Sequence, residues 1–128
     1  MMEAPIATRS FYLKDGTQEP AVVFRIWRPY QPEGEYPRCA YELVSAQGTD
    51  KGEVHGVDAL SCIIICLSQA GSKIAGLNES VFGGQLVWEA SPEGGRGLGL
   101  PTIEDHWPFL EPYREAIQRL RDEESPNR

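Results

Sequence analysis

The longest apolar stretch of the chain, residues 57–77 (VDALSCIIICLSQAGSKIAGL), constrains the fold most. Its three successive isoleucines at 63–65 favour a strand by themselves, but about 20 residues between glycines is too long for an ordinary strand. We therefore expect a helix. At about 100° per residue its larger apolar and small side chains share one arc. The apolar arc contains Leu60, Ile63, Ile64, Leu67, Ala70, Gly71, Ile74 and Ala75, and the polar arc contains Asp58, Ser61, Ser68, Gln69, Ser72 and Lys73.

Polar and glycine residues mark both ends of this helix, and one isoleucine lies off the apolar arc. Asp58 is placed to cap the free N–H groups of the first turn, and Gly76 or Asn78 is suited to end the helix in a left-handed conformation. Ile65 falls on the polar side. Two explanations stay open for it: the C-terminal segment or a loop covers it, or it is a subunit contact.

Alternating side chains predict strands at residues 6–13, 21–28, 38–46 and 85–90. The polar, glycine-containing stretch 47–56 is expected to be a loop, and a short fifth strand is expected near 98–100. A C-terminal helix is expected to begin near Phe109.

These elements predict an α+β fold with two layers. An antiparallel sheet of four or five strands carries the long central helix on one face, with a shorter C-terminal helix. We expect one domain over residues 1–122 and a frayed tail over 123–128. The exposed face of the sheet is expected to carry polar residues such as Arg9, Arg25 and Glu42.

Charge and composition exclude some classes of function. Twelve Lys and Arg against 19 Asp and Glu give a net charge of −7, which is poorly suited to binding a nucleic-acid backbone. The uninterrupted apolar run 62–67 is too short to span a bilayer, and the first ten residues do not resemble a signal peptide. We therefore expect a cytoplasmic protein with three reduced cysteines.

No motif predicts a metal, a cofactor or a catalytic centre. Cys62 and Cys66 lie one helical turn apart, but Cys39, His55 and His106 do not complete a zinc-ligand spacing. Buried thiols that pack as small apolar groups are the simpler interpretation. The carboxylates Glu104, Asp105 and Glu111 are explained as residues at a helix start.

Loops and aromatic residues supply the candidate binding residues. The glycine-rich stretch 94–99 lacks the spacing and the following helix of a dinucleotide site, although Arg96 in it is free to contact an anion or a partner. The proline-rich loop 29–37 presents two aromatic side chains. The candidate binding residues are Tyr30, Tyr36, Tyr41, Trp88 and Arg96.

The chain resembles a family of small, uncharacterised bacterial proteins, a domain of unknown function. The resemblance rests on IATRSFYLKDG, VFRIWRP, CAYEL, GVDALSCIIICLSQAGSKIAGL, LVWEA and GLGLP. Ser61 and Cys62 stand where the resemblance leads us to expect a Gln-Ala pair. The resemblance implies the fold and supplies no catalytic residues.

Two functions are consistent with these features. The first is a non-enzymatic protein-interaction module, similar to immunity or adaptor proteins, with a protein partner or a second copy as its target. The second is a small-molecule-binding protein or enzyme with a cleft near loops 29–37 and 94–101. The absence of a coherent catalytic constellation favours the first.

Overall fold

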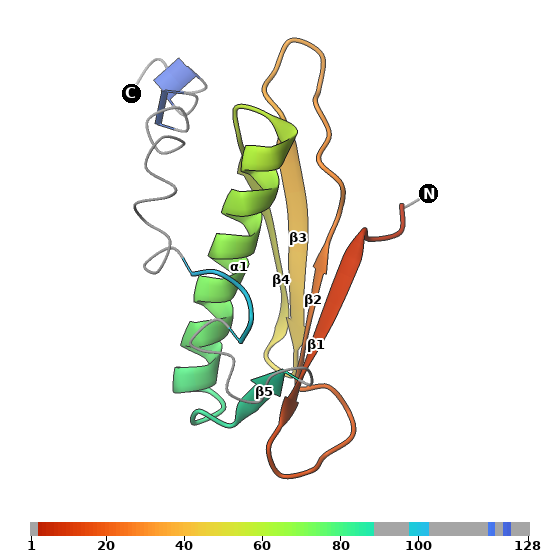
Figure 1. Ribbon diagram of the computed structural model, residues 1–128, viewed down its shortest axis with the longest axis vertical. Coiled ribbons are helices and arrows are strands. Elements are labelled where there is room, and N and C mark those ends of the chain that lie inside the picture. The colour runs from red at the N-terminus through yellow and green to blue at the C-terminus, as the bar shows by residue number, and fades with distance from the viewer. Residues whose placement is uncertain (1–2, 89–97, 103–117, 120–121, 124–128) are drawn as a thin grey trace.

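The computed structural model describes residues 3–88, 98–102, 118–119 and 122–123. This part of the chain forms a five-stranded antiparallel sheet with a long helix against one face (Figure 1). The elements in chain order are β1 (Ala7–Leu13), β2 (Val22–Ile26), β3 (Arg38–Ser45), β4 (Gly48–His55), α1 (Ala59–Ser80) and β5 (Leu86–Trp88). The order across the sheet is β4-β3-β2-β1-β5. The predicted α+β class is confirmed, whereas the predicted C-terminal helix lies almost entirely outside the described residues.

The fifth strand lies at residues 48–55, where the sequence predicted a loop. β4 pairs with β3 over its whole length, from Arg38 opposite His55 to Ser45 opposite Gly48, and Gly48 has a φ of 122° at the turn. Its polar sequence is tolerated because β4 is an edge strand, and charged side chains there discourage pairing with other chains. The prediction of a short strand near residues 98–100 is wrong, because those residues form a turn in which Leu98 has a φ of 52°.

The start of α1 is as predicted and its end is not. Asp58 Oδ1 accepts a hydrogen bond from the Ser61 backbone N–H at 2.7 Å, and the Ser61 hydroxyl accepts one from the Asp58 N–H at 3.1 Å. This reciprocal pair closes the first turn. The helix continues past Gly76 and Asn78 to Ser80. Instead of ending the helix, the Asn78 side chain accepts a hydrogen bond from the Leu86 N–H at 2.9 Å and ties the helix end to β5.

The core lies between α1 and the inward side of the sheet. Alternate residues of the strands point to α1, and nine of them are buried: Phe11, Val22, Phe24, Ile26, Cys39, Tyr41, Leu43, Val54 and Leu86. From α1, the buried side chains that join this cluster are Cys62, Cys66, Ala70 and Ile74. Most of these helix side chains are small, so the helix can approach the sheet closely.

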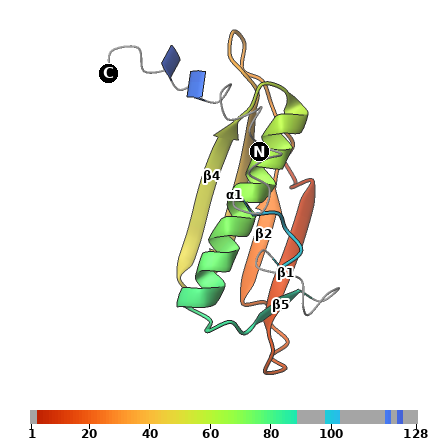
Figure 2. The same ribbon diagram turned by 60° about the vertical axis from the view of Figure 1, so that its left-hand side comes forward.

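The apolar arc predicted for α1 is partly wrong. Leu60 is 62% exposed, whereas Ser61 and Ser68 are fully buried. Gly56 lies against Ser61 in the first turn, and residues 98–102 cross α1 on a second side near its middle (Figure 2). There the Pro101 carbonyl oxygen rests on Gly71, where no larger residue would fit. The sheet and residues 98–102 therefore surround α1 near Gly71. In the first turn Ser61 and Cys62 are buried, while Leu60 points outward.

By length and composition alone α1 could also cross a membrane, although the run 62–67 is short. A core helix meets the same criterion. Here it packs against β3 and β4.

Candidate functional site

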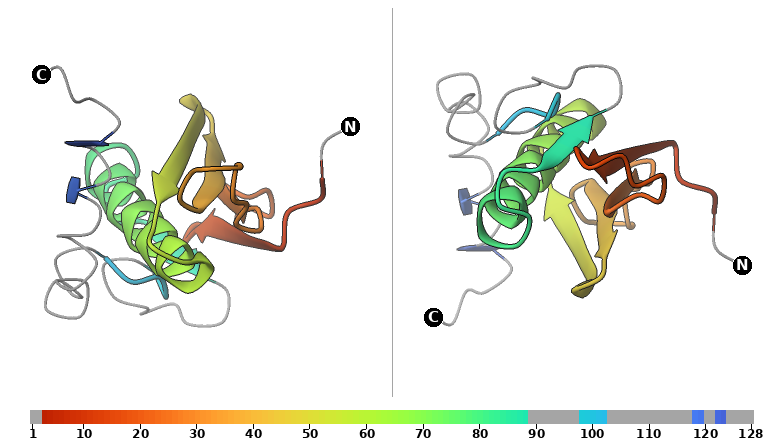
Figure 3. Two further views of the ribbon diagram at one scale, coloured as in Figure 1. Left: turned by 90° about the horizontal axis from the view of Figure 1, so that it is seen from above. Right: turned by 90° about the horizontal axis from the view of Figure 1, so that it is seen from below.

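One side of the sheet faces α1, and the other side is reached by neither α1 nor residues 98–102 (Figure 3). We call this second side the open face. Because side chains alternate along a strand, the observed register assigns its members. They are Ile6, Thr8, Ser10, Tyr12, Val23, Arg25, Trp27, Arg38, Ala40, Glu42, Val44, Thr49, Lys51, Glu53, His55 and Val87. Arg9, which was predicted on this face, lies on the other side, with its guanidinium carbon 3.8 Å from the centre of the Trp88 ring.

The open face is ordered in rows across β2, β3 and β4. One row runs from Arg25 through Glu42 to Lys51, so its charges alternate in sign. Arg25 and Glu42 form an ion pair at 3.0 Å. The rows on either side of it are largely uncharged: Trp27, Ala40 and Glu53 on one side, and Val23, Val44 and Thr49 on the other.

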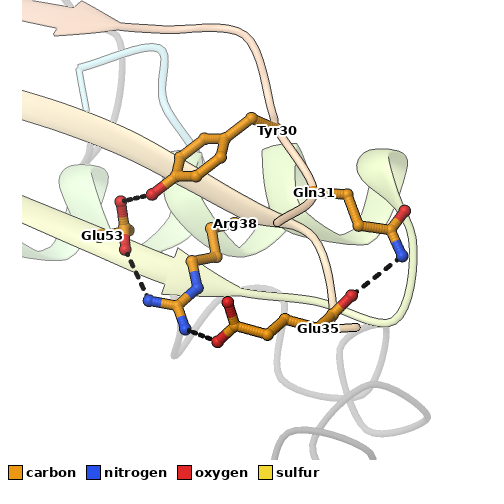
Figure 4. A network of polar contacts seen from close by, with 5 residues as sticks. All are labelled: Tyr30, Gln31, Glu35, Arg38 and Glu53. Carbon is orange, nitrogen blue, oxygen red and sulfur yellow. Dashed lines mark hydrogen bonds and ion pairs between the residues drawn. The ribbon is translucent and has the colours of Figure 1, made fainter. Parts of the chain in front are cut away.

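A polar cluster joins the proline-rich loop to one end of this face (Figure 4). The Tyr30 hydroxyl donates to Glu53 at 2.6 Å, and the Arg38 guanidinium contacts Glu53 at 3.3 Å and Glu35 at 2.6 Å. The hydrogen bond to Glu53 raises the pKa of Tyr30, and the same carboxylate raises the pKa of Arg38. Tyr30 therefore stays protonated and Arg38 charged, so the cluster fixes the loop on β3 and β4 and supplies no reactive group.

A hollow of about 320 Å³ lies on the open face beside Trp27. The Trp27 indole N–H donates to the backbone oxygen of Glu3 at 2.9 Å, and Arg28 pairs with the Glu3 carboxylate at 2.7 Å. The hollow is lined by Glu3, Trp27, Ala40, Tyr41, Glu42, Lys51 and Gly52. It is an open, aromatic-walled depression of the kind that accepts a side chain from a partner.

The charges on and beside the open face nearly balance. Four basic side chains (Arg25, Arg28, Arg38 and Lys51) accompany five acidic ones (Glu3, Glu33, Glu35, Glu42 and Glu53), and seven of the nine take part in the ion pairs of this region. The whole chain has a net charge of −7. Most of the excess negative charge therefore belongs to the rest of the molecule, and the open face is close to neutral.

The three cysteines meet in the core between β3 and α1. Each is fully buried; the Cys39 thiol contacts the Trp27 carbonyl oxygen at 3.4 Å and the Cys62 thiol contacts the Pro37 carbonyl oxygen at 3.2 Å. A hydrogen bond with Cys39, together with burial, raises the pKa of Cys66, and burial raises the pKa of Cys62 to about 11. Cys62 and Cys66 are therefore protonated near neutral pH. Within the described residues, no three His, Cys, Asp or Glu side chains are arranged to hold a metal ion.

This burial makes the stability of the fold sensitive to alkali. The ordinary pKa of a thiol is about 8.5, so the unfolded chain loses the Cys62 proton before the folded chain does. Deprotonation then favours the unfolded state: the stability due to this thiol is complete below about pH 8.5 and is lost between that value and about pH 11.

We expect Cys62→Ala to remove a slope of about 1.4 kcal/mol per pH unit over that interval. Urea unfolding of both proteins across the pH series measures the slope. An identical slope in the variant would show that the Cys62 thiol is not the titrating group.

Residues 7–102, which include all five strands and α1, match a family described as a domain of unknown function, DUF6968. The chain belongs to the DUF6968 family. The predicted resemblance to such a family is confirmed, while its bacterial origin stays an expectation. No curated protein and no solved structure matches this DUF6968 chain.

The DUF6968 fold does not gather the predicted binding residues in one place. Tyr30 and Tyr36 are exposed in the proline-rich loop, whereas Tyr41 is 2% exposed in the core. Trp88 points to the α1 side, where it stacks against Arg9 and Gly99, and Arg96 lies outside the described residues. A binding role for any of them stays a prediction. Ile65 is half-buried and packs against the core, and a subunit contact there is likewise still a prediction.

The cleft proposed near loops 29–37 and 94–101 involves two separate parts of the DUF6968 fold. Loop 29–37 extends past one end of the sheet, and residues 98–101 lie across the middle of α1 (Figures 1 and 2). Residues 94–97 lie outside the described part. The hollow beside Trp27 was not found from the sequence, because its lining depends on the register of β4.

Proposed function

We propose that this DUF6968 domain is a protein-interaction module, similar to immunity or adaptor proteins, that binds its partner through the open face. The observation that carries the proposal is the composition and exposure of that face. Trp27, Tyr12 and Arg25 belong to the residue types most enriched in interfaces, and all three are only partly covered within the chain.

The arrangement of these residues also favours binding over chemistry. General acid, base or nucleophilic catalysis needs a side chain that is free to react and a neighbour that activates it. Around the hollow, Glu42 is engaged by Arg25, and Trp27 is hydrogen-bonded to the backbone of Glu3. Ion pairs on a half-exposed surface of this kind contribute specificity when a partner covers them.

A pair of matched variants tests this proposal. Val44→Lys places a charge in the middle of the open face, and Val81→Lys makes the same change at the exposed end of α1. We expect Val44→Lys to reduce association at least tenfold while Val81→Lys binds like the wild type, because an unpaired charge in a covered interface is costly.

The measurement is quantitative cross-linking in cells that express each tagged chain, normalised to bait recovered. Equal yields from all three chains would contradict the proposal, whether they cross-link well or not at all. Circular dichroism of each purified chain tests whether both variants keep the fold.

A further inference from the structure

The rows of the open face are complementary to themselves, and we propose that its occupant is a second copy of this chain. The proposal rests on the proposed function, because it names the partner of the same face. The two sheets would pack face to face as an aligned sandwich, with strands of the two copies within about 30° of each other. Such a contact is isologous: each copy contributes the same surface.

One two-fold axis satisfies this arrangement. It runs parallel to the strands, midway between the copies and over the gap between β2 and β3. This axis places β2 of one copy opposite β3 of the other, and β1 opposite β4. Each row then faces the same row of the second copy in reverse order.

The residues that this axis brings together carry opposite charges. Arg25 faces the partner's Glu42, and Glu42 faces the partner's Arg25, so the two internal ion pairs join in a ring of four alternating charges. A network of this kind suits partly covered surfaces better than isolated pairs do, because each side chain is already held by its own chain.

In the two flanking rows, the side chains that face one another across the two copies are complementary in size. Trp27, the largest side chain, faces the partner's Ala40, among the smallest, and Val23 faces the partner's Val44. The hollow beside Trp27, which Ala40 also lines, is the space into which the partner's indole would project. In β-sandwiches the two sheets lie about 10 Å apart, and large side chains of one sheet fill the space above small side chains of the other.

Charge also selects a second copy over other partners. Two chains that each carry −7 repel one another wherever their acidic surfaces meet, and the open face is a region close to neutral. A strongly basic partner would instead be drawn to the acidic remainder of the molecule.

The experiment uses two charge reversals, made in separate full-length chains. In Arg25→Glu, the four central positions of a dimer would all be negative, and in Glu42→Arg they would all be positive. We expect each variant alone to dissociate at least about 100-fold more readily than the wild type. In an equimolar mixture each of the four central charges faces an opposite charge on the other chain, although the two charges within one chain are alike, so we expect mixed dimers of one copy of each variant. Sedimentation velocity and native mass spectrometry measure the species.

Two controls separate folding from association. The double variant Arg25→Glu, Glu42→Arg in one chain regains both the internal pair and the contact between copies, so it should dimerise like the wild type. Val44→Lys leaves the ion pair intact and should be monomeric. If neither single reversal keeps the wild-type circular dichroism spectrum, the comparison of these two controls decides the question.

Every other outcome overturns the inference. A wild type that stays monomeric at high concentration excludes a second copy, and single reversals that remain dimeric place the contact elsewhere. Monomeric reversals that fail to pair when mixed exclude the opposition of β2 and β3. In each of these cases the cellular cross-linking of Val44→Lys and Val81→Lys still decides whether the open face binds another protein.

Discussion

Phe11→Ala is expected to lower the free energy of unfolding by about 3–5 kcal/mol, the largest effect of any single change considered for this chain. Phe11 is fully buried in β1, where it lies between Val22 of β2 and Trp88 of β5. Removing the ring leaves a cavity at the centre of the core. Small domains have total stabilities of about 5–15 kcal/mol, so the variant should lose a large part of the stability of the fold. The midpoint of urea unfolding measures the loss.

Tyr12→Ala is the matched control for this change. Tyr12 is the next residue of β1, it is also aromatic, and it points to the open face, where it is half-buried. We expect a loss of about 1 kcal/mol in a dilute sample. Equal losses for the two variants would mean that the strand does not present one face to α1 and the other outward.

Gly71→Ala is expected to lower the free energy of unfolding by about 1–3 kcal/mol, although alanine is ordinarily the better helix former. A methyl group on Gly71 would collide with the Pro101 carbonyl oxygen and lie 3.2 Å from the Leu100 Cβ. The obstructing group is backbone, so no side-chain rotation relieves the overlap. Residues 98–102 would have to move off α1, and that displacement would expose Ser68 and Leu98, which are now buried.

Gly76→Ala supplies the control on the same helix. An added Cβ at Gly76 has no neighbour within 4 Å, so the change should stabilise the protein by about 0.5–1 kcal/mol. The two substitutions are chemically identical and opposite in expected sign. Thermal unfolding of both chains tests them, and a gain from both would show that residues 98–102 do not rest on Gly71.

Periodicity predicted most of the architecture. β1, β2 and β3 alternate apolar and polar side chains because one face of each is buried, and α1 is long enough to exclude a strand. β4 was missed because an edge strand buries little: in the sequence GTDKGEVH only Val54 is buried, so its pattern resembles that of a loop. Its identity depends on pairing with β3, which local sequence does not encode.

The candidate site was less predictable than the fold. Arg25 and Glu42 were expected outside, but their pairing and the row they share with Lys51 follow from the register of three strands. The buried side of α1 was misjudged for a related reason. Hydrophobicity predicted that Leu60 would be buried. The buried positions are instead held by small residues such as Gly71 and Ser68, because residues 98–102 and the sheet approach the helix closely.

Hydroxyl-radical footprinting at low and high protein concentration tests most directly whether the open face is the surface that becomes covered. Oxidation of Tyr12 and Trp27 is followed by mass spectrometry, with exposed Leu60 on α1 as the internal reference. The predicted result is protection of Tyr12 and Trp27 as concentration rises, with Leu60 unchanged, and loss of that protection in Arg25→Glu. Protection of Leu60 with unchanged oxidation of Tyr12 and Trp27 would contradict the account.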